Sequence, residues 1–201
     1  STDADFSIRA STGTIDHNGQ TAIYNGVISD YSGSDHGRLS IINSGNAGAG
    51  AAVLNASNTF SSGTEVHAGA VLQISSGAAL GSGDLALIGS SSVPATLKTS
   101  ANMTTTISSA INDGAEPGDV VVSGGGTLRL TAANAYSGRT TIAAGSTLQL
   151  AGADAAIASS SGLHNLGQFD IATAAATLAL TGSGITPVAD FTQAAALLPG
   201  H

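Results

Sequence analysis

The segment NASNTFSSGTEVHAGAVLQI at residues 55–74 recurs as TAANAYSGRTTIAAGSTLQL at residues 131–150, at an offset of 76 positions. Aligned without gaps, the two copies agree at polar, glycine and apolar positions, among them Asn58/Asn134, the conservative exchange Phe60/Tyr136, Gly69/Gly145 and Leu72/Leu148. Self-similarity at a fixed spacing is the signature of a solenoid or another repeat array.

The repeat extends beyond these segments. AIYNGVISD at residues 22–30 is matched by TTISSAIND at residues 105–113, at an offset of 83 rather than 76. The sequence therefore predicts two units, at about residues 22–80 and 105–155. A short insertion or deletion at a turn accounts for the change in offset.

The composition indicates a folded chain with a core of small aliphatic side chains. Among 201 residues there are 27 glycines, 9% charged residues, 3% aromatics and 42% hydrophobic residues. Disordered chains combine low hydrophobicity with high charge, which is the opposite balance.

The charge balance argues against nucleic acid as a partner. The formal net charge is −8, and Lys98 is the single lysine beside four arginines, whereas phosphate neutralisation needs clustered Lys and Arg. There is no cysteine, so no disulfide framework or thiolate site is expected. We find no signal peptide and no apolar run long enough for a transmembrane helix, and we expect a mature or excised fragment.

Short alternating apolar runs, without helical patterns between them, predict an all-β fold. Such strands fit a sandwich, a barrel or a coiled solenoid, and the repeat with so few aromatics favours the solenoid. At roughly 20–25 residues a coil, each unit holds three or four coils and the chain about nine, a rod on the order of 40 Å. We expect one segment over residues 1–185, and a short helix or cap over residues 186–201, where Pro187 suits a first helical position.

NAYSGRTTI at residues 134–142, followed by AGSTLQL at residues 144–150, resembles the passenger-associated transport repeat of bacterial autotransporters. The resemblance implies a right-handed parallel β-helix, exported across the outer membrane of a Gram-negative bacterium through a C-terminal β-barrel and displayed or released at the cell surface. The chain departs from the usual Tyr-Ser-Gly-Gly-Thr at two places: Phe60-Ser61-Ser62-Gly63-Thr64 in the first copy, and Arg139 in the second.

A catalytic interpretation would start from the histidines, namely His17, His36, His67, His164 and His201. Asp16 and Asp35 directly precede two of them, but adjacent residues on a strand point to opposite faces. No Gly-x-Ser-x-Gly, His-Glu-x-x-His or phosphate-binding loop occurs. We therefore expect no enzymatic activity and no cofactor.

Metal binding is not expected either. Ligands such as His17 and His36 would have to meet across coils, and solvated turns explain them as well. The turn Gly81-Ser82-Gly83-Asp84 is one partial copy of a calcium-binding motif that works in tandem. The carboxylates of Asp113 and Glu116 could serve glycoside hydrolysis, but they also suit a turn.

The positions with the clearest expected role are the repeated ones: Asn58, Phe60, Gly69, Asn134, Tyr136, Gly138 and Gly145. The asparagines are expected to bond the backbone of the next coil. The two aromatics could be exposed platforms for glycans, or they could fill space at one corner of the coil.

Two functions remain open from the sequence. The first is an adhesin or self-association module, whose partners are a host-cell or matrix surface or the same protein on neighbouring cells. The second is a scaffold that promotes folding and export of an effector, such as a protease, outside this chain. A carbohydrate-cleaving β-helix is a third hypothesis, and it requires clustered carboxylates on one face.

Overall fold

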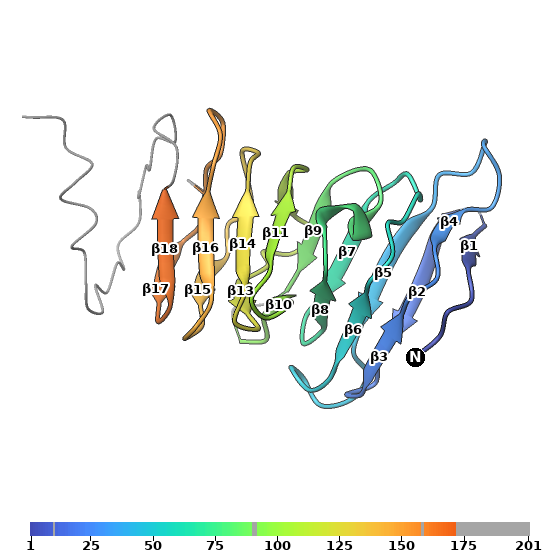
Figure 1. Cartoon of the computed structure of the whole chain (residues 1–201), viewed down its shortest axis with the longest axis horizontal. Helices are drawn as coiled ribbons and strands as arrows, with labels where there is room; N and C mark the ends of the chain where they lie inside the picture. Colours follow the sequence, from blue (N-terminus) through green and yellow to red (C-terminus); the bar gives the residue numbers. More distant parts are fainter. Residues whose placement is uncertain (10, 90–91, 158, 172–201) are drawn as a thin grey trace, which may run out of the picture.

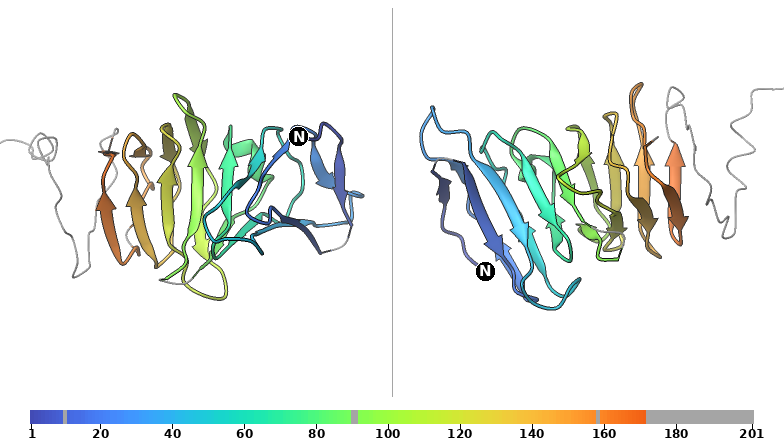
Figure 2. Two further views of the ribbon diagram at one scale, coloured as in Figure 1. Left: turned by 90° about the horizontal axis from the view of Figure 1, so that it is seen from below. Right: turned by 180° about the vertical axis from the view of Figure 1, so that it is seen from behind.

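The chain folds as a parallel β-helix. The computed structural model describes residues 1–9, 11–89, 92–157 and 159–171, and in them the chain forms eighteen strands and one short 3-10 helix. The strand pairs are parallel throughout. Figure 1 shows the coils stacked side by side from β1–β3 at one end to β17–β18 at the other, and the two views of Figure 2 show the same order. The predicted all-β solenoid is confirmed.

The longest sheet runs along most of the rod, and we call its outer surface the seven-stranded face. Its order is β17-β15-β13-β10-β8-β6-β3. The strands are β3 (Thr21–Tyr24), β6 (Ala51–Leu54), β8 (Val71–Ile74), β10 (Ala95–Thr99), β13 (Val120–Ser123), β15 (Arg139–Ile142) and β17 (Gly162–Asn165).

A second sheet, the five-stranded face, has the order β12-β9-β7-β5-β2. Its strands are β2 (Thr12–Asp16), β5 (Arg38–Ile42), β7 (Thr64–His67), β9 (Leu85–Ile88) and β12 (Ile111–Asp113). The same side of the solenoid continues without regular strands, through a parallel bridge between Ala133 and Ala156.

The third face is assembled from several pieces. A two-stranded sheet of β1 (Phe6–Ile8) and β4 (Ile28–Asp30) begins it, and a four-stranded sheet of β11 (Thr104–Ile107), β14 (Thr127–Leu130), β16 (Thr147–Leu150) and β18 (Gln168–Ile171) ends it. Between them lie residues 58–60, bonded to β4 through Thr59 N to Ile28 O (2.9 Å), and the 3-10 helix η1 (Gly77–Leu80), which contacts β11.

Each strand of the seven-stranded face belongs to one coil, so the described residues make seven coils. The coils differ in length. The step from β6 to β8, where Ala52 pairs with Leu72, is short, whereas the step from β3 to β6, where Thr21 pairs with Ala51, includes the loop at residues 43–50. The predicted cap at residues 186–201 lies outside the described residues.

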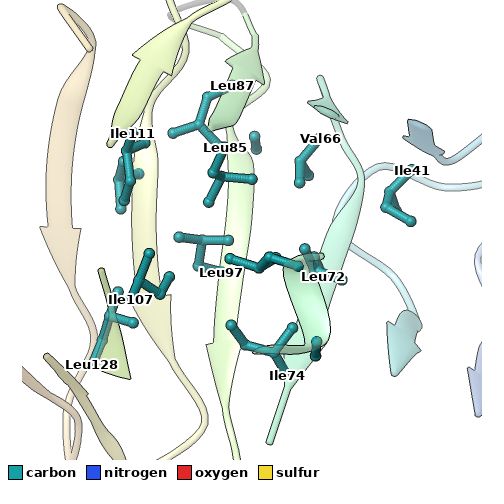
Figure 3. Close-up of a cluster of buried hydrophobic side chains, with 14 of the residues drawn as sticks. Ile41, Val66, Leu72, Ile74, Leu85, Leu87, Leu97, Ile107, Ile111 and Leu128 are labelled. Atoms are coloured by element: carbon teal, nitrogen blue, oxygen red, sulfur yellow. The ribbon is translucent and has the colours of Figure 1, made fainter. Parts of the chain in front are cut away.

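The core is a continuous column of buried aliphatic side chains, and Figure 3 shows a part of it, with Val66, Leu87 and Ile111 among the labelled residues. Ile41, Val66 and Leu87 are paired in register and buried, so they stack across three coils of the five-stranded face. Small side chains fill a solenoid because facing sheets lie only about 10 Å apart. Among the described residues no helix has the length and hydrophobicity to cross a membrane.

The two repeat copies do not occupy the same side of the solenoid. In the first copy, residues 58–60 lie on the third face and β7 on the five-stranded face. In the second, Ala135 bonds β12 on the five-stranded face (Ala135 N to Ile111 O, 2.8 Å), and β15 lies in the seven-stranded sheet. The offset of 76 residues between the two copies therefore corresponds to three complete coils plus one additional face of the solenoid. The expectation that Phe60 and Tyr136 share one corner is wrong for this reason.

Candidate functional site

Asn58 and Asn134 each tie three coils together. The Oδ1 atom of Asn58 accepts the backbone N–H of Ile28 (2.8 Å), and its Nδ2 donates to Ala79 O on the following coil (2.6 Å). Asn134 repeats this pattern: Oδ1 accepts the N–H of Ile111 (3.0 Å) and Nδ2 donates to Ala156 O (2.9 Å). Both side chains are buried, so these bonds satisfy backbone groups that water does not reach.

A carboxylate stands beside each asparagine. Asp113 accepts hydrogen bonds from Gly118 N (3.1 Å) and from the hydroxyl (2.6 Å) and N–H of Ser137 on the next coil. Asp30 likewise accepts from Gly37 N (2.6 Å). Desolvation raises its pKa, but hydrogen bonds from Ser61 and Gly37 outweigh this and leave the pKa of Asp30 below its ordinary value.

These contacts explain the two offsets in the sequence. Asp30 and Asp113 end the matched segments 22–30 and 105–113, whereas their serine partners, Ser61 and Ser137, belong to the matched segments 55–74 and 131–150. Each pair joins consecutive coils, and the first of these coils carries the long loop at residues 43–50, where the second has only the turn at residues 124–126. The sequence repeats both the aspartates and the serines, but only the register between coils shows that each aspartate bonds the serine of the next coil.

The repeated aromatics are interior residues. Phe60 and Tyr136 have no exposed surface, which excludes the alternative of glycan-stacking platforms. The Tyr136 hydroxyl lies 2.6 Å from Thr140 Oγ1, and burial raises the pKa of Tyr136 far above its ordinary value.

The repeated glycines meet two backbone requirements. Gly69 and Gly145 both have φ of +75°, in the turn between two strands, where a side chain is strained. Gly138 lies against the preceding coil, since a Cβ there would come within 2.3 Å of Gly118 O. The seven repeated positions thus make contacts within the solenoid or adopt the backbone conformation of its turns.

A polar groove lies on the five-stranded face, and we call it the acidic groove. It has a volume of about 520 Å³ and crosses β5, β7, β9 and β12. Its charged and amide groups come from successive coils: Arg38, Glu65, Asp84, Asn112 and Asp113.

Hydrogen bonds and one ion pair hold these groups in place. Arg38 Nη1 pairs with Glu65 Oε1 (2.5 Å), and Asn112 Nδ2 donates to Asp84 Oδ2 (2.9 Å). Asp113 lines the groove while it holds Ser137. Three carboxylates and one arginine therefore line the groove, which suits cationic partners or ligands rich in hydroxyl groups.

The sequence does not predict the groove, although Asp113 and the turn Gly81–Asp84 each stand out in it separately. Each lining residue stands alone in the sequence. Parallel pairing brings them together, because Glu65 lies opposite Ala86 and Ala86 opposite Asn112.

The histidines of the described ranges do not form one site. His17 is buried, and its Nε2 accepts the N–H of Val71 (3.2 Å), so burial lowers its pKa below the ordinary value. His36 Nδ1 lies 3.0 Å from Ser61 Oγ, and His67 Nε2 lies 3.0 Å from Ser40 Oγ.

The other predicted candidates are dispersed as well. His164 is on β17, at the far end of the seven-stranded face from β3, and His201 is outside the described residues. Asp16 accepts from Ser44 and Asn18, not from His17. Within the described ranges, no three His, Asp or Glu side chains are grouped to hold a metal.

Comparison with known families gives one match, in two places. The passenger-associated transport repeat matches residues 47–74 and residues 120–150, which contain β6 to β8 and β13 to β16 respectively. The two matches are consistent with an autotransporter passenger domain and thus with export from a Gram-negative bacterium. Searches of curated proteins and of solved structures returned no significant match.

Proposed function

Because the chain carries two passenger-associated transport repeats in a parallel β-helix, we propose that it is a surface-displayed or secreted passenger segment that acts as an adhesin or self-association module. The observation that carries this proposal is the acidic groove, which extends over four successive coils with fixed polar groups. A surface of this shape offers many weak polar contacts to an extended partner. The partner is a host-cell or matrix surface, or the same protein on a neighbouring cell.

The test uses bacteria that display the full-length protein. We expect aggregation of the cells, or their attachment to host cells, to fall when Asp84 and Asn112 are both changed to alanine. Both side chains belong to the groove and their mutual bond is on the surface, so the coils should stay intact. A matched control changes Asn55 to alanine, an exposed asparagine outside the groove. If the parent, the double variant and the Asn55→Ala control attach or aggregate equally, the groove does not mediate adhesion.

We propose binding rather than catalysis at the groove. The carbohydrate-cleaving alternative requires two carboxylates available for acid and base work. Glu65 is ion-paired with Arg38, and Asp113 is engaged by Ser137 and Gly118. Incubation of the chain with mixed oligosaccharides should release no reducing ends. Release that disappears in Asp84→Ala would establish an enzyme instead.

The second candidate is a scaffold for folding and export of an effector outside this chain. The buried asparagine bonds favour it, since they place the repeated residues inside the solenoid. Deletion of residues 123–150 from the full-length protein should lower surface display and leave the specific activity of the displayed effector unchanged. Normal display after the deletion would argue against this function.

A further inference from the structure

The strands of the seven-stranded face carry two cations and no acids. None of its seven strands contains Asp or Glu, although the chain has 13 acidic residues and a net charge of −8. Lys98 and Arg139 are on this sheet, two of only five Lys and Arg residues. Lys98 lies between buried Leu97 and Thr99, so alternation directs its side chain outward.

Arg139 is the more accessible of the two cations. It is exposed, and its neighbour Thr140 is buried, so Arg139 also points outward. Its backbone N–H donates to Asp119 Oδ1 (2.7 Å) at the corner of the face. Across the described part of the chain, the guanidinium of Arg139 and the ammonium of Lys98 have no salt bridge.

The acidic groove lies on a different side of the same rod and has the opposite charge. Its one cation, Arg38, is already paired with Glu65, which leaves Asp84 and Asp113 in excess. Lys98 and Arg139 are two strands apart in their sheet, or about 10 Å at the usual strand separation. The excess carboxylates Asp84 and Asp113 lie on neighbouring coils, within that axial length.

We propose that the seven-stranded face of one molecule docks onto the acidic groove of a second copy of this chain. The inference rests on the self-association arm of the proposed function and names its two surfaces. Because the contact joins different faces, it is heterologous: each molecule keeps a free groove and a free cationic face. Association therefore continues side by side instead of stopping at a dimer.

The experiment is sedimentation velocity of the purified chain over a range of concentrations, at about 0.05 M and about 0.5 M salt. We expect open-ended oligomers at low salt that dissociate at high salt. The double variant Lys98→Glu, Arg139→Glu and the groove variant Asp84→Lys should each raise the dissociation constant at least about tenfold. Asp154→Lys, at an exposed acid away from both surfaces, should behave as the parent chain.

Mixing supplies the decisive measurement. The double variant offers an acidic face, and Asp84→Lys offers a basic group in the groove, so an equimolar mixture should recover association that neither variant shows alone. Circular dichroism confirms that each variant is folded. A parent chain that sediments as a monomer throughout, or a mixture that stays dissociated, overturns the inference. Attachment to host cells, measured with the same variants, tests the proposed adhesion separately.

Discussion

Replacing Asn134 with alanine should destabilise the second half of the solenoid by an amount that the contacts define. The N–H of Ile111, a residue with no exposed surface, loses its acceptor, which costs about 1–3 kcal/mol, and the two lost amide bonds add roughly 0.5–1.5 kcal/mol each. The carbonyls of Ala132 and Ala156 keep backbone donors. We therefore expect a loss of about 2–6 kcal/mol.

Native-state hydrogen exchange is the suitable assay, because coils can open locally. The amide of Ile111 should exchange roughly 30-fold faster or more in Asn134→Ala, while amides of the first coils change little. Asn55→Ala is the matched control, since Asn55 is exposed and its amide bonds another surface asparagine, Asn25; it should change stability by less than about 0.5 kcal/mol. If the Ile111 amide stays protected in Asn134→Ala, the bridging role is refuted.

Three further outcomes follow from single groups. Gly145→Ala should lower the free energy of unfolding in urea by about 1 kcal/mol, since its φ is +75° and no described atom crowds the site. Gly138→Ala should lower it more, because its Cβ would meet backbone atoms; equal losses would contradict this. Tyr136→Phe should cost about 1 kcal/mol through its hydroxyl bond, and no change would mean that the bond is unimportant. Burial lowers the pKa of His17, so stability is complete above its unfolded pKa of about 6.5 and is lost as the pH falls below it. His17→Gln removes the titrating group, so its free energy of unfolding should fall less between pH 7.5 and pH 5 than that of the parent chain.

The fold could be predicted because a solenoid leaves its period in the sequence. The paired segments at residues 55–74 and 131–150 indicate the repeat, and their shared apolar positions Leu72 and Leu148 are buried in the structure. The low content of aromatic residues favours a solenoid over a sandwich or a barrel. These are local signals, set by strand geometry and turn chemistry, so they survive in a single sequence.

The groove could not be predicted, since it depends on register between coils of unequal length. Glu65 and Asn112 share a surface only because two unequal steps along the chain bring Thr64, Leu85 and Ile111 into line. Nothing at either residue marks that relation. The burial of Tyr136 was also undecided from sequence, because an aromatic at a turn serves equally as a platform or a wedge.

Because the second copy of the repeat lies one face further round the solenoid than the first, each added copy would be rotated about the axis by one face. Because there are three faces, three successive copies would occupy three different faces, and a fourth copy would lie on the same face as the first. Gain or loss of one unit by recombination would therefore turn everything downstream by one face relative to everything upstream. In a passenger built this way, unit number sets the direction in which a surface points as well as its distance from the cell.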